Sequence, residues 1–244
     1  MKTCLIGVDG LLGREWIEAL KNLNHHIIGL GPSPSPQSKL ANFIDKYHAL
    51  DLSSSSDDDL KAIFSNERPI NIIFNAGVDA KPGSGQEALT SYPLESWKEI
   101  FEINVFGLVK VLNAAATNQF RPKNVIVIGS MYSEKSPNPS LYSHYGEKGL
   151  TKHPAYSSSK HAALGIVKQY ASHYAAQGMV INMLSPGAVY SGQDELFVEK
   201  ISEKIPMKRL VSPSELQSIL KFLLEENTYA TGQNFVLDGG MNLW

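Results

Sequence analysis

Short apolar runs alternate with amphipathic stretches along the whole chain, and this alternation restricts the fold more than any other feature. Most runs are apolar without interruption, which is typical of strands buried on both faces of a parallel sheet. We expect strands at about 3–8, 25–31, 46–51, 70–77, 124–130, 179–187 and 234–240, and helices at about 57–65, 94–118, 155–177 and from Ser212. With no internal repeat, the pattern predicts one α/β domain over residues 1–244.

Composition and charge exclude several classes of protein. The chain has 244 residues and a formal net charge of −2, without a run of Lys or Arg, so we expect neither a nucleic-acid surface nor a membrane surface. No apolar run approaches ~18 residues and no signal segment is evident, so we expect a cytoplasmic protein. The single cysteine, Cys4, is expected to pack in the core. His25 and His26 are expected at a strand edge, and no metal site is predicted.

The turn after the first strand carries three glycines, in the sequence GVDGLLG. Gly7, Gly10 and Gly13 stand between a strand and a helix, where bare backbone can approach a pyrophosphate and the helix N-terminus favours anions. We therefore predict a dinucleotide site that includes these glycines and the intervening Leu11 and Leu12. Asp9 is out of place in such a turn, because its carboxylate must point away from the phosphates or weaken their binding.

The ends of the next strands bear on the choice of cofactor. An acidic residue after the second strand favours NAD and a basic one favours NADP, but here the sequence GLGPSPS offers only Ser33, Ser35 and the more distant Lys39. Asp51 and Leu52 follow the third strand, where Asp51 either contacts the adenine or caps a turn. The residues of the fourth strand's turn, Asn75, Ala76 and Gly77, are expected beside the nucleotide. The cofactor is predicted to be NAD or NADP, with NAD slightly favoured.

A tyrosine and a lysine lie one helical turn apart in the sequence YSSSK. Lys160 continues an apolar helix face below Tyr156, and an unpaired charge on such a face is unfavourable unless it has a task. A tyrosine has a pKa of about 10, too high for a base at neutral pH. A neighbouring ammonium would lower that pKa, and it could also hold a ribose hydroxyl.

Two further polar residues are expected near this pair. Ser130 ends the fifth strand, where its hydroxyl could polarise a substrate carbonyl. Asn104 interrupts the apolar face of the helix at 94–118. It is either a buried amide bonded to backbone or the anchor of a water that passes protons to Lys160.

These motifs, taken in order, resemble the short-chain dehydrogenase/reductase family over essentially the whole chain. The resemblance implies a Rossmann-type, doubly wound parallel sheet of about seven strands with helices on both faces. It also implies a nicotinamide cofactor, hydride transfer to or from a small-molecule substrate, and a homodimer or homotetramer paired through 94–118 and 155–177. By the same resemblance Tyr156 is the general acid/base, Ser130 orients the substrate, Lys160 lowers the tyrosine pKa and binds the ribose, and Asn104 holds a relay water. Cofactor contacts are implied for Pro186, Gly187 and Val189.

The sequence departs from the family in three places. The glycines follow a different spacing, the acidic residue after the second strand is missing, and Tyr156 comes 26 positions after Ser130, about twice the usual gap. The extra segment, at about 131–153, is polar and is expected to cover the substrate through Tyr132, Tyr142 and Tyr145. In it, His144 or Lys148 could meet a phosphate or belong to a solvated loop.

The lead hypothesis is an NAD(P)-dependent oxidoreductase acting on a hydroxyl or carbonyl carbon of a sugar or nucleotide-sugar. The hydroxyl-rich insertion suits a polyol, and the motifs are similar to those of oxidoreductases of flagellin modification and polysaccharide synthesis. One alternative is a 3-oxoacyl-carrier-protein reductase or a general carbonyl reductase. Another is a nucleotide-binding scaffold that has lost turnover, which the altered glycine turn favours and the complete set of catalytic residues opposes.

Overall fold

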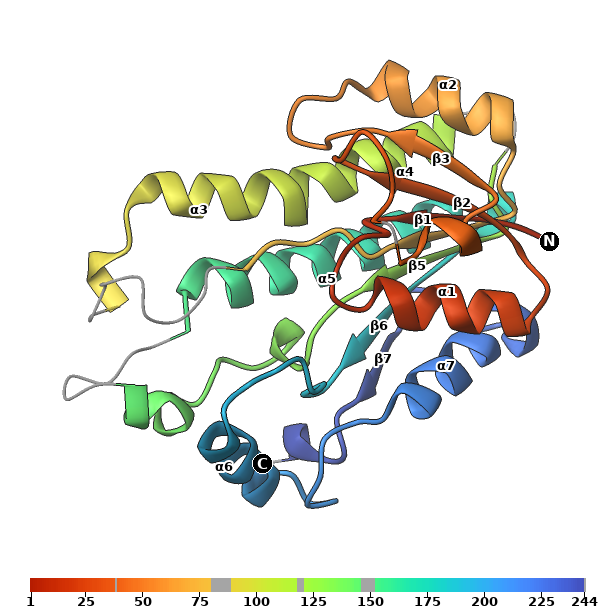
Figure 1. Ribbon diagram of the computed structural model, residues 1–244. Helices are drawn as coiled ribbons and strands as arrows, with labels where there is room; N and C mark the ends of the chain where they lie inside the picture. Colours follow the sequence, from red (N-terminus) through yellow and green to blue (C-terminus); the bar gives the residue numbers. More distant parts are fainter. Residues whose placement is uncertain (38, 80–88, 118–120, 146–151, 244) are drawn as a thin grey trace.

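The computed structural model contains a seven-stranded, fully parallel sheet of strand order β3-β2-β1-β4-β5-β6-β7 (Figure 1). The structure describes residues 1–244 except 38, 80–88, 118–120, 146–151 and 244. Strand order reverses between β1 and β4, so the loops after these strands diverge and leave a crevice at the carboxyl edge of the sheet. The expected doubly wound Rossmann-type sheet is confirmed.

The strands are β1 (Lys2–Ile6), β2 (His26–Gly31), β3 (Lys46–Ala49), β4 (Asn71–Phe74), β5 (Asn124–Ile128), β6 (Val180–Pro186) and β7 (Asn234–Leu237). The α-helices are α1 (Gly13–Asn22), α2 (Asp57–Glu67), α3 (Leu94–Phe101), α4 (Gly107–Thr117), α5 (Pro154–Tyr174), α6 (Glu195–Lys204) and α7 (Pro213–Lys221). Every expected strand is present, and most end two or three residues earlier than the apolar runs do. The helix expected from Ser212 is α7, and it opens with a capping box between Ser212 and Glu215.

Two parts of the helical prediction need correction. The helix expected over 94–118 is interrupted by a π-helical turn, η3 (Glu102–Phe106), which joins α3 to α4. Helix α6 was not predicted, because its apolar face is short and contributes only Ile201 to the fully buried set. The helix expected over 155–177 runs from Pro154 to Tyr174 and continues as a short 3-10 turn.

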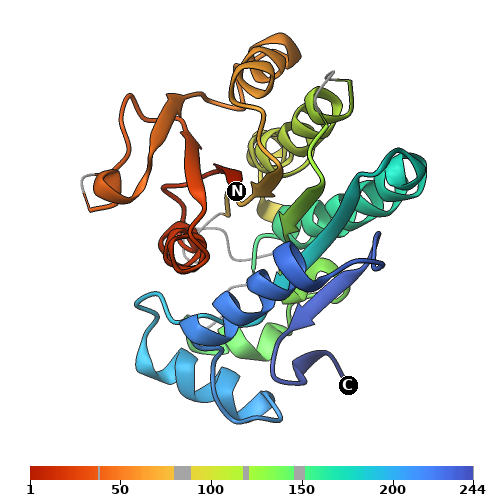
Figure 2. The ribbon, with the colours of Figure 1, turned by 90° about the vertical axis from the view of Figure 1, so that its right-hand side faces the viewer.

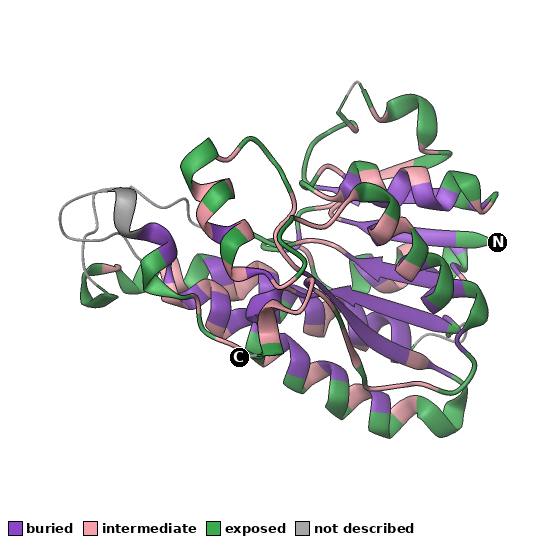
Figure 3. Ribbon diagram, turned by 90° about the horizontal axis from the view of Figure 1, so that it is seen from below, coloured by how far each residue is buried: buried purple, intermediate pink, exposed green. Residues whose placement is uncertain are grey.

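Helices cover both faces of the sheet in two separate layers (Figures 1 and 2). Helices α1 and α7 pack together on one face, over a core that includes Trp16, Leu20 and Leu216. Helices α2, α4 and α5 cover the other face, over a core that includes Phe64, Leu112 and Val167. Because both faces are covered, the central strands are buried along their whole length (Figure 3).

Buried polar side chains line the amino edge of the sheet. Thr3 Oγ1 and His25 Nδ1 lie 2.7 Å apart, and Asn71 Nδ2 donates a 3.2 Å hydrogen bond to Thr3 Oγ1. His25 directly precedes β2 and His26 begins it, so the two histidines lie at the edge of a strand, and His25 is only 6% exposed. Thr3 supplies the partner that lets an imidazole be buried there. Cys4 is buried as expected, and burial raises the pKa of its thiol.

The continuous helical segment Leu94–Thr117 is long and apolar enough to cross a membrane by length and composition alone. In this structure 56% of its most apolar window is buried inside the protein, and α4 contributes much of the core above β1, β4 and β5. A core helix of a globular domain passes the same test, so the segment is weak support for a membrane span.

Candidate active site

The glycine turn is wedged between β1, β4 and α1. Gly7 has φ +78°, and a Cβ placed on it would lie 2.5 Å from the backbone of Ala76. A Cβ on Gly13 would lie 1.9 Å from the carbonyl oxygen of Val8, where α1 begins. A Cβ on Gly10 would lie 3.0 Å from Asn75 Nδ2. Close packing against backbone therefore requires glycine at positions 7 and 13. At position 10 an added Cβ would press on the Asn75 side chain, so Gly10 leaves room for that amide.

Asn75 holds the glycine turn to the end of β4. Its Oδ1 accepts a 2.8 Å hydrogen bond from the indole N–H of Trp16, and its Nδ2 donates a 2.7 Å bond to the carbonyl of Gly7. The sequence suggested only a small turn beside the nucleotide at this position. The structure adds a specific role for the amide, which is to fix the shape of the turn that a nucleotide would meet.

A cavity of roughly 340 Å³ opens between the ends of β1, β2 and β4. It brings together seven of the predicted cofactor residues: Gly7, Gly10, Asp51, Leu52, Asn75, Ala76 and Gly77. Glycine residues and apolar side chains such as Leu30, Leu50 and Ile103 line it at a strand-order reversal, a surface that fits the adenosine half of a nicotinamide dinucleotide. Asp51 lines this cavity, and its Oδ1 accepts hydrogen bonds from the N–H and hydroxyl of Ser53, so the structure displays the turn cap, and contact with the adenine remains a prediction.

The other predicted cofactor residues lie outside the lining of this cavity. Leu11 is 71% exposed beside α1, and Leu12 packs toward the core. Pro186 is the last residue of β6, and Val189 forms a bridge to Val211 two residues past Gly187. A Cβ on Gly187 would lie 2.7 Å from Asp238 Cα, so this glycine is needed for packing against the turn after β7. Contacts of these residues with a cofactor remain predictions.

Tyr156 and Lys160 lie one turn apart at the start of α5, as the sequence predicted. The Lys160 side chain is 6% exposed, and its Nζ donates a 2.9 Å hydrogen bond to the carbonyl of Ile128, the last residue of β5. The same Nζ lies 5.8 Å from the centre of the Tyr156 ring. Ser130 lies two residues beyond the end of β5, and its Oγ both interacts with the Tyr156 phenol and accepts a 3.1 Å bond from the N–H of Tyr132.

Burial dominates the acid–base properties of this pair. Burial, reinforced by the negative charge of Asp79, raises the pKa of Tyr156 to about 12, against an opposing hydrogen bond with Ser130. Burial also lowers the pKa of Lys160 to about 8, against the opposing charge of Asp79. The expected lowering of the Tyr156 pKa by Lys160 is therefore not seen here, because desolvation of the phenolate outweighs an ammonium that is directed at Ile128.

Asn104 lies in the π-helical turn η3 and is 2% exposed. Its Oδ1 accepts a 2.8 Å bond from the N–H of Val78, and its Nδ2 donates to the carbonyl of Val78 at 3.0 Å and to Ser159 Oγ at 2.9 Å. Of the two alternatives from the sequence, the amide bonded to backbone is the one the structure displays. The relay-water role remains a prediction. π-helical turns occur often at functional sites, and this one aims the amide at the residue after Gly77.

An ion pair beside Tyr156 had no counterpart in the sequence analysis. Asp79 follows the turn after β4, and its carboxylate pairs with Lys152, which precedes α5. Lys152 Nζ lies 4.8 Å from the centre of the Tyr156 ring. The two residues are 73 positions apart in the sequence, so no local motif joins them. The one signal in the sequence is that Asp79 follows the end of a predicted strand.

The insertion after Ser130 packs against α6. Tyr132 and Tyr142 are buried with their hydroxyl oxygens 3.3 Å apart, and they form a cluster with Ile201 and Ile205 against which Tyr156 packs. The side chains of His144 and Tyr145, and all of Lys148, lie outside the described residues. The insertion therefore borders Tyr156, and its covering of a substrate remains a prediction.

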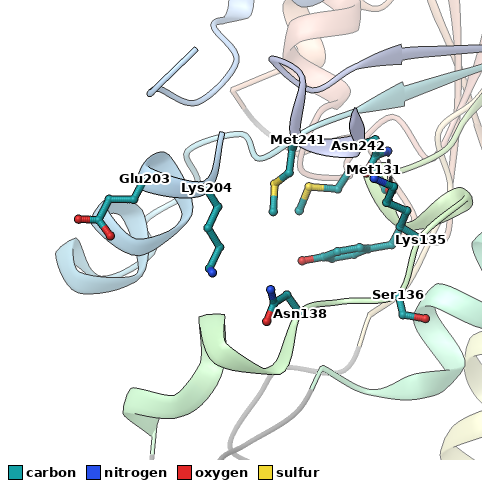
Figure 4. Close-up of a pocket in the computed structure, with 9 residues that line it drawn as sticks. Met131, Lys135, Ser136, Asn138, Glu203, Lys204, Met241 and Asn242 are labelled. Carbon is teal, nitrogen blue, oxygen red and sulfur yellow. Dashed lines mark hydrogen bonds between the residues drawn. The ribbon is translucent and has the colours of Figure 1, made fainter. Parts of the chain in front are cut away.

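A pocket of roughly 230 Å³ lies between the insertion, α6 and the C-terminal residues (Figure 4). Lys204 and Asn138 point toward each other across it, the thioethers of Met131 and Met241 form one wall, and Glu203 points away. Tyr132 lines this pocket and also belongs to the cluster against which Tyr156 packs. The pocket is polar on one side and apolar on the other.

A glycine turn at the switch point of a doubly wound sheet, with a serine, a tyrosine and a lysine at the end of its middle strand, defines a nicotinamide-dependent oxidoreductase. A family model described as enoyl-(acyl carrier protein) reductase matches residues 39–242. The chain belongs to the short-chain dehydrogenase/reductase family, and it is an NAD(P)-dependent oxidoreductase.

Relatives and solved structures agree with this assignment. The chain is 26% identical to 2-keto-3-deoxy-L-fuconate dehydrogenase of Xanthomonas campestris, over 98% of this chain and 79% of that protein. It is also 26% identical to a 3-oxoacyl-(acyl-carrier-protein) reductase of Buchnera aphidicola, over 97% of this chain and 95% of that protein. A short-chain dehydrogenase of Leptospira borgpetersenii with bound NAD+ has the same fold, with a TM-score of 0.80 and 23% identity, covering 98% of this chain and 92% of that one.

Proposed function

We propose that the protein oxidises a hydroxyl, or reduces a carbonyl, on a sugar or a sugar derivative, with Tyr156 exchanging the proton. The observation that best supports this proposal is the arrangement of Ser130, Tyr156 and Lys160 near the end of β5. They lie beside the cavity between the ends of β1, β2 and β4, here called the nucleotide cavity. The nicotinamide cofactor, when bound, supplies or accepts the hydride. Its binding is supported by Gly7, Gly10 and Gly77, which line the cavity and let backbone approach a ligand there.

The roles of the catalytic residues follow from their surroundings. Tyr156 has a pKa of about 12 and is therefore protonated at neutral pH, so it is ready to donate its proton to a developing alkoxide. Ser130 orients the substrate oxygen toward the same phenol. Lys160 has a pKa of about 8 and can approach the cofactor ribose, because Gly77 leaves its Nζ only 3.4 Å from where a Cβ would stand. Asn104 keeps the segment at Val78 in place and is proposed to anchor a proton-relay water.

The sugar substrate is supported by the chemistry of the insertion and by one relative. The tyrosine hydroxyls of residues 132 and 142, with Asn138, give this region hydrogen-bonding groups suited to a polyol. The Xanthomonas relative is named for a keto-deoxy sugar acid. The second candidate function is a 3-oxoacyl thioester reductase, which the Buchnera relative favours.

A substrate panel separates the two candidates. Purified protein is mixed with each nicotinamide cofactor and with sugars, sugar acids, nucleotide-sugars or a 3-oxoacyl thioester, and nicotinamide absorbance is followed. Turnover of a sugar derivative, with none of the thioester, supports the proposal. Turnover confined to the thioester favours the second candidate.

We also infer a cytoplasmic homodimer or homotetramer that pairs through the helical segment Leu94–Thr117 and through α5. In α5, a Cβ added to Gly165 would meet open space, and Phe106, the last residue of η3, is exposed. A glycine on an open helix face and an exposed aromatic ring are suited to helix–helix contact between copies. Light scattering of wild-type protein and of a Gly165→Arg variant tests this. A mass of one chain for the wild type would exclude the oligomer.

A further inference from the structure

The end of β2 lacks the acidic side chain that in such folds recognises the adenosine ribose. Gly31 is the last residue of β2, and Pro32 and Ser33 follow it. We propose that Asp9, which comes from the glycine turn after β1, takes the place of that acid and makes the protein selective for NAD over NADP. The inference rests on the proposed cofactor-dependent function and names the residue that sets its specificity.

The Asp9 carboxylate lies over the end of β2 and away from the phosphate-facing backbone of the turn. Its Oδ1 accepts a 3.0 Å hydrogen bond from the N–H of Gln37, and its Oδ2 lies 3.5 Å from the hydroxyl of Tyr47. A Cβ placed on Gly31 would lie 2.8 Å from Asp9 Oδ2. The carboxylate thus occupies the space that a side chain at the end of β2 would otherwise fill, and Gly31 makes that placement possible.

This carboxylate is part of the nucleotide cavity. Asp9 lines it together with Gly31, Ser33 and Gln37, and the same cavity continues to Asp51 and to the turn after β4. Asp9 is only half-buried, so a ligand in the cavity can reach it. Asp9 therefore stands on the β2 side of a cavity whose other wall is formed by the turn after β4.

The carboxylate has acceptor capacity to spare. Two carboxylate oxygens offer about four lone-pair sites, and the Gln37 N–H uses one of them. Tyr47 donates to the carbonyl of Ser33 at 2.9 Å, a better bond than its 3.5 Å approach to Asp9. Burial and the charge of Asp9 raise the pKa of Tyr47 to about 12, so this neighbour stays neutral. A vicinal diol such as the ribose 2′- and 3′-hydroxyls can donate to the free sites, whereas a 2′-phosphate would be repelled.

Two cationic side chains near Asp9, Arg14 and Lys39, could instead favour binding of the 2′-phosphate of NADP. Arg14 and Lys39 line a neighbouring cavity that Asp9 also borders. Arg14 is engaged by Glu18 at 2.8 Å, which reduces its availability to a phosphate. If Lys39 and Arg14 prevailed over Asp9, the protein would prefer NADP.

The test is a fluorescence titration of the full chain with NADH and with NADPH, for the wild type and for Asp9→Asn. Asparagine keeps the acceptor for Gln37 and removes the charge, and thermal melting verifies that the variant is folded. Asp51→Asn is the matched control, because it removes one negative charge from the same cavity away from β2. We expect the wild type to bind NADH about 100-fold more tightly than NADPH. Asp9→Asn should reduce this ratio to below about 10, and Asp51→Asn should leave it within about threefold of the wild-type ratio.

The outcomes separate this inference from the proposed function. Equal or tighter binding of NADPH by the wild type, or an unchanged ratio in Asp9→Asn, overturns the role of Asp9 while leaving the oxidoreductase function intact. A similar fall in the ratio for Asp51→Asn also overturns it, because the effect would then be general to charge. If neither nucleotide binds the wild type, the proposed function fails and the inference fails with it.

Discussion

Asn104 and Val78 are joined by two hydrogen bonds, one from the Val78 N–H to Asn104 Oδ1 at 2.8 Å and one from Asn104 Nδ2 to the Val78 carbonyl at 3.0 Å. The Asn104 amide thereby bonds to both the N–H and the carbonyl of Val78, just beyond the end of β4, as the backbone of a neighbouring strand would. The turn at Gly77, which borders both the nucleotide cavity and Lys160 Nζ, is held in place by this pair.

Replacing Asn104 with Ala should therefore affect both stability and cofactor binding. We expect the free energy of unfolding to fall by about 1–2 kcal/mol, since Val78 loses both partners but is exposed enough for water to replace them. NADH affinity should fall as the turn loosens. Urea unfolding and NADH titration measure the two effects. Asn113→Ala, which removes a 2.6 Å bond from Tyr170 on α5, is the control and should lose stability while keeping NADH affinity.

Lys160→Met should separate stability from turnover. The pKa of Lys160 is lowered to about 8, so below that pH the folded protein holds a buried charge that the unfolded chain holds in water. Replacing Lys160 with Met removes the free-energy cost of burying this ammonium, so the melting temperature should stay the same or rise. Turnover should fall at least about 100-fold. Lys2→Met, which also loses a bond to a backbone carbonyl, should keep full turnover. A large drop in melting temperature for Lys160→Met would show that the lysine is structural.

Gly7→Ala should be far more damaging than Gly178→Ala. Both glycines have positive φ, +78° and +83°, so the backbone strain of an alanine is matched. Only at Gly7 does the new Cβ meet backbone, at 2.5 Å from Ala76, whereas around Gly178 there is open space. We expect Gly178→Ala to lose about 1 kcal/mol and Gly7→Ala at least about 2 kcal/mol more, as measured by urea unfolding. Equal losses would mean that the turn can move away from β4.

His25 should make the protein less stable in mild acid. Burial, together with the charge of the chain's N-terminus, lowers the pKa of His25 despite the nearby Glu225. Below about pH 6.5 the unfolded chain binds a proton that the native state resists, so stability falls as pH falls through that value. Urea midpoints between about pH 5 and 7 should show this slope, and His25→Gln should flatten it. His173→Gln, on the surface end of α5, should leave the slope unchanged.

The sheet could be predicted from the sequence because its strands are buried on both faces. After their first residues, Asn71 and Asn124, β4 and β5 are apolar, and burial on both faces follows from that pattern. Helix α6 could not be predicted, since only Ile201 is fully buried and the helix is held by contacts with the distant insertion. The π-helical turn that contains Asn104 could not be predicted, because the local sequence does not distinguish it from a regular α-helical turn.

The candidate site was predictable where function depends on local spacing. Tyr156 and Lys160 share a helix, and the glycine turn is contiguous, so both could be predicted from sequence. The position of Asp9 over Gly31 and the ion pair of Asp79 with Lys152 depend on loops brought together by the fold. The raised pKa of Tyr156 could not be predicted from the sequence either, because it comes from burial of the phenol by residues distant in the sequence.

The most direct test of the central role of Tyr156 is a comparison of the wild type with Tyr156→Phe in both NADH binding and turnover of whichever substrate the panel identifies. Phenylalanine keeps the buried ring and removes the hydroxyl that exchanges the proton. We expect NADH affinity to stay within about threefold and kcat to fall by about 100-fold or more. A kcat close to the wild-type value would contradict the assignment of Tyr156 as the acid/base.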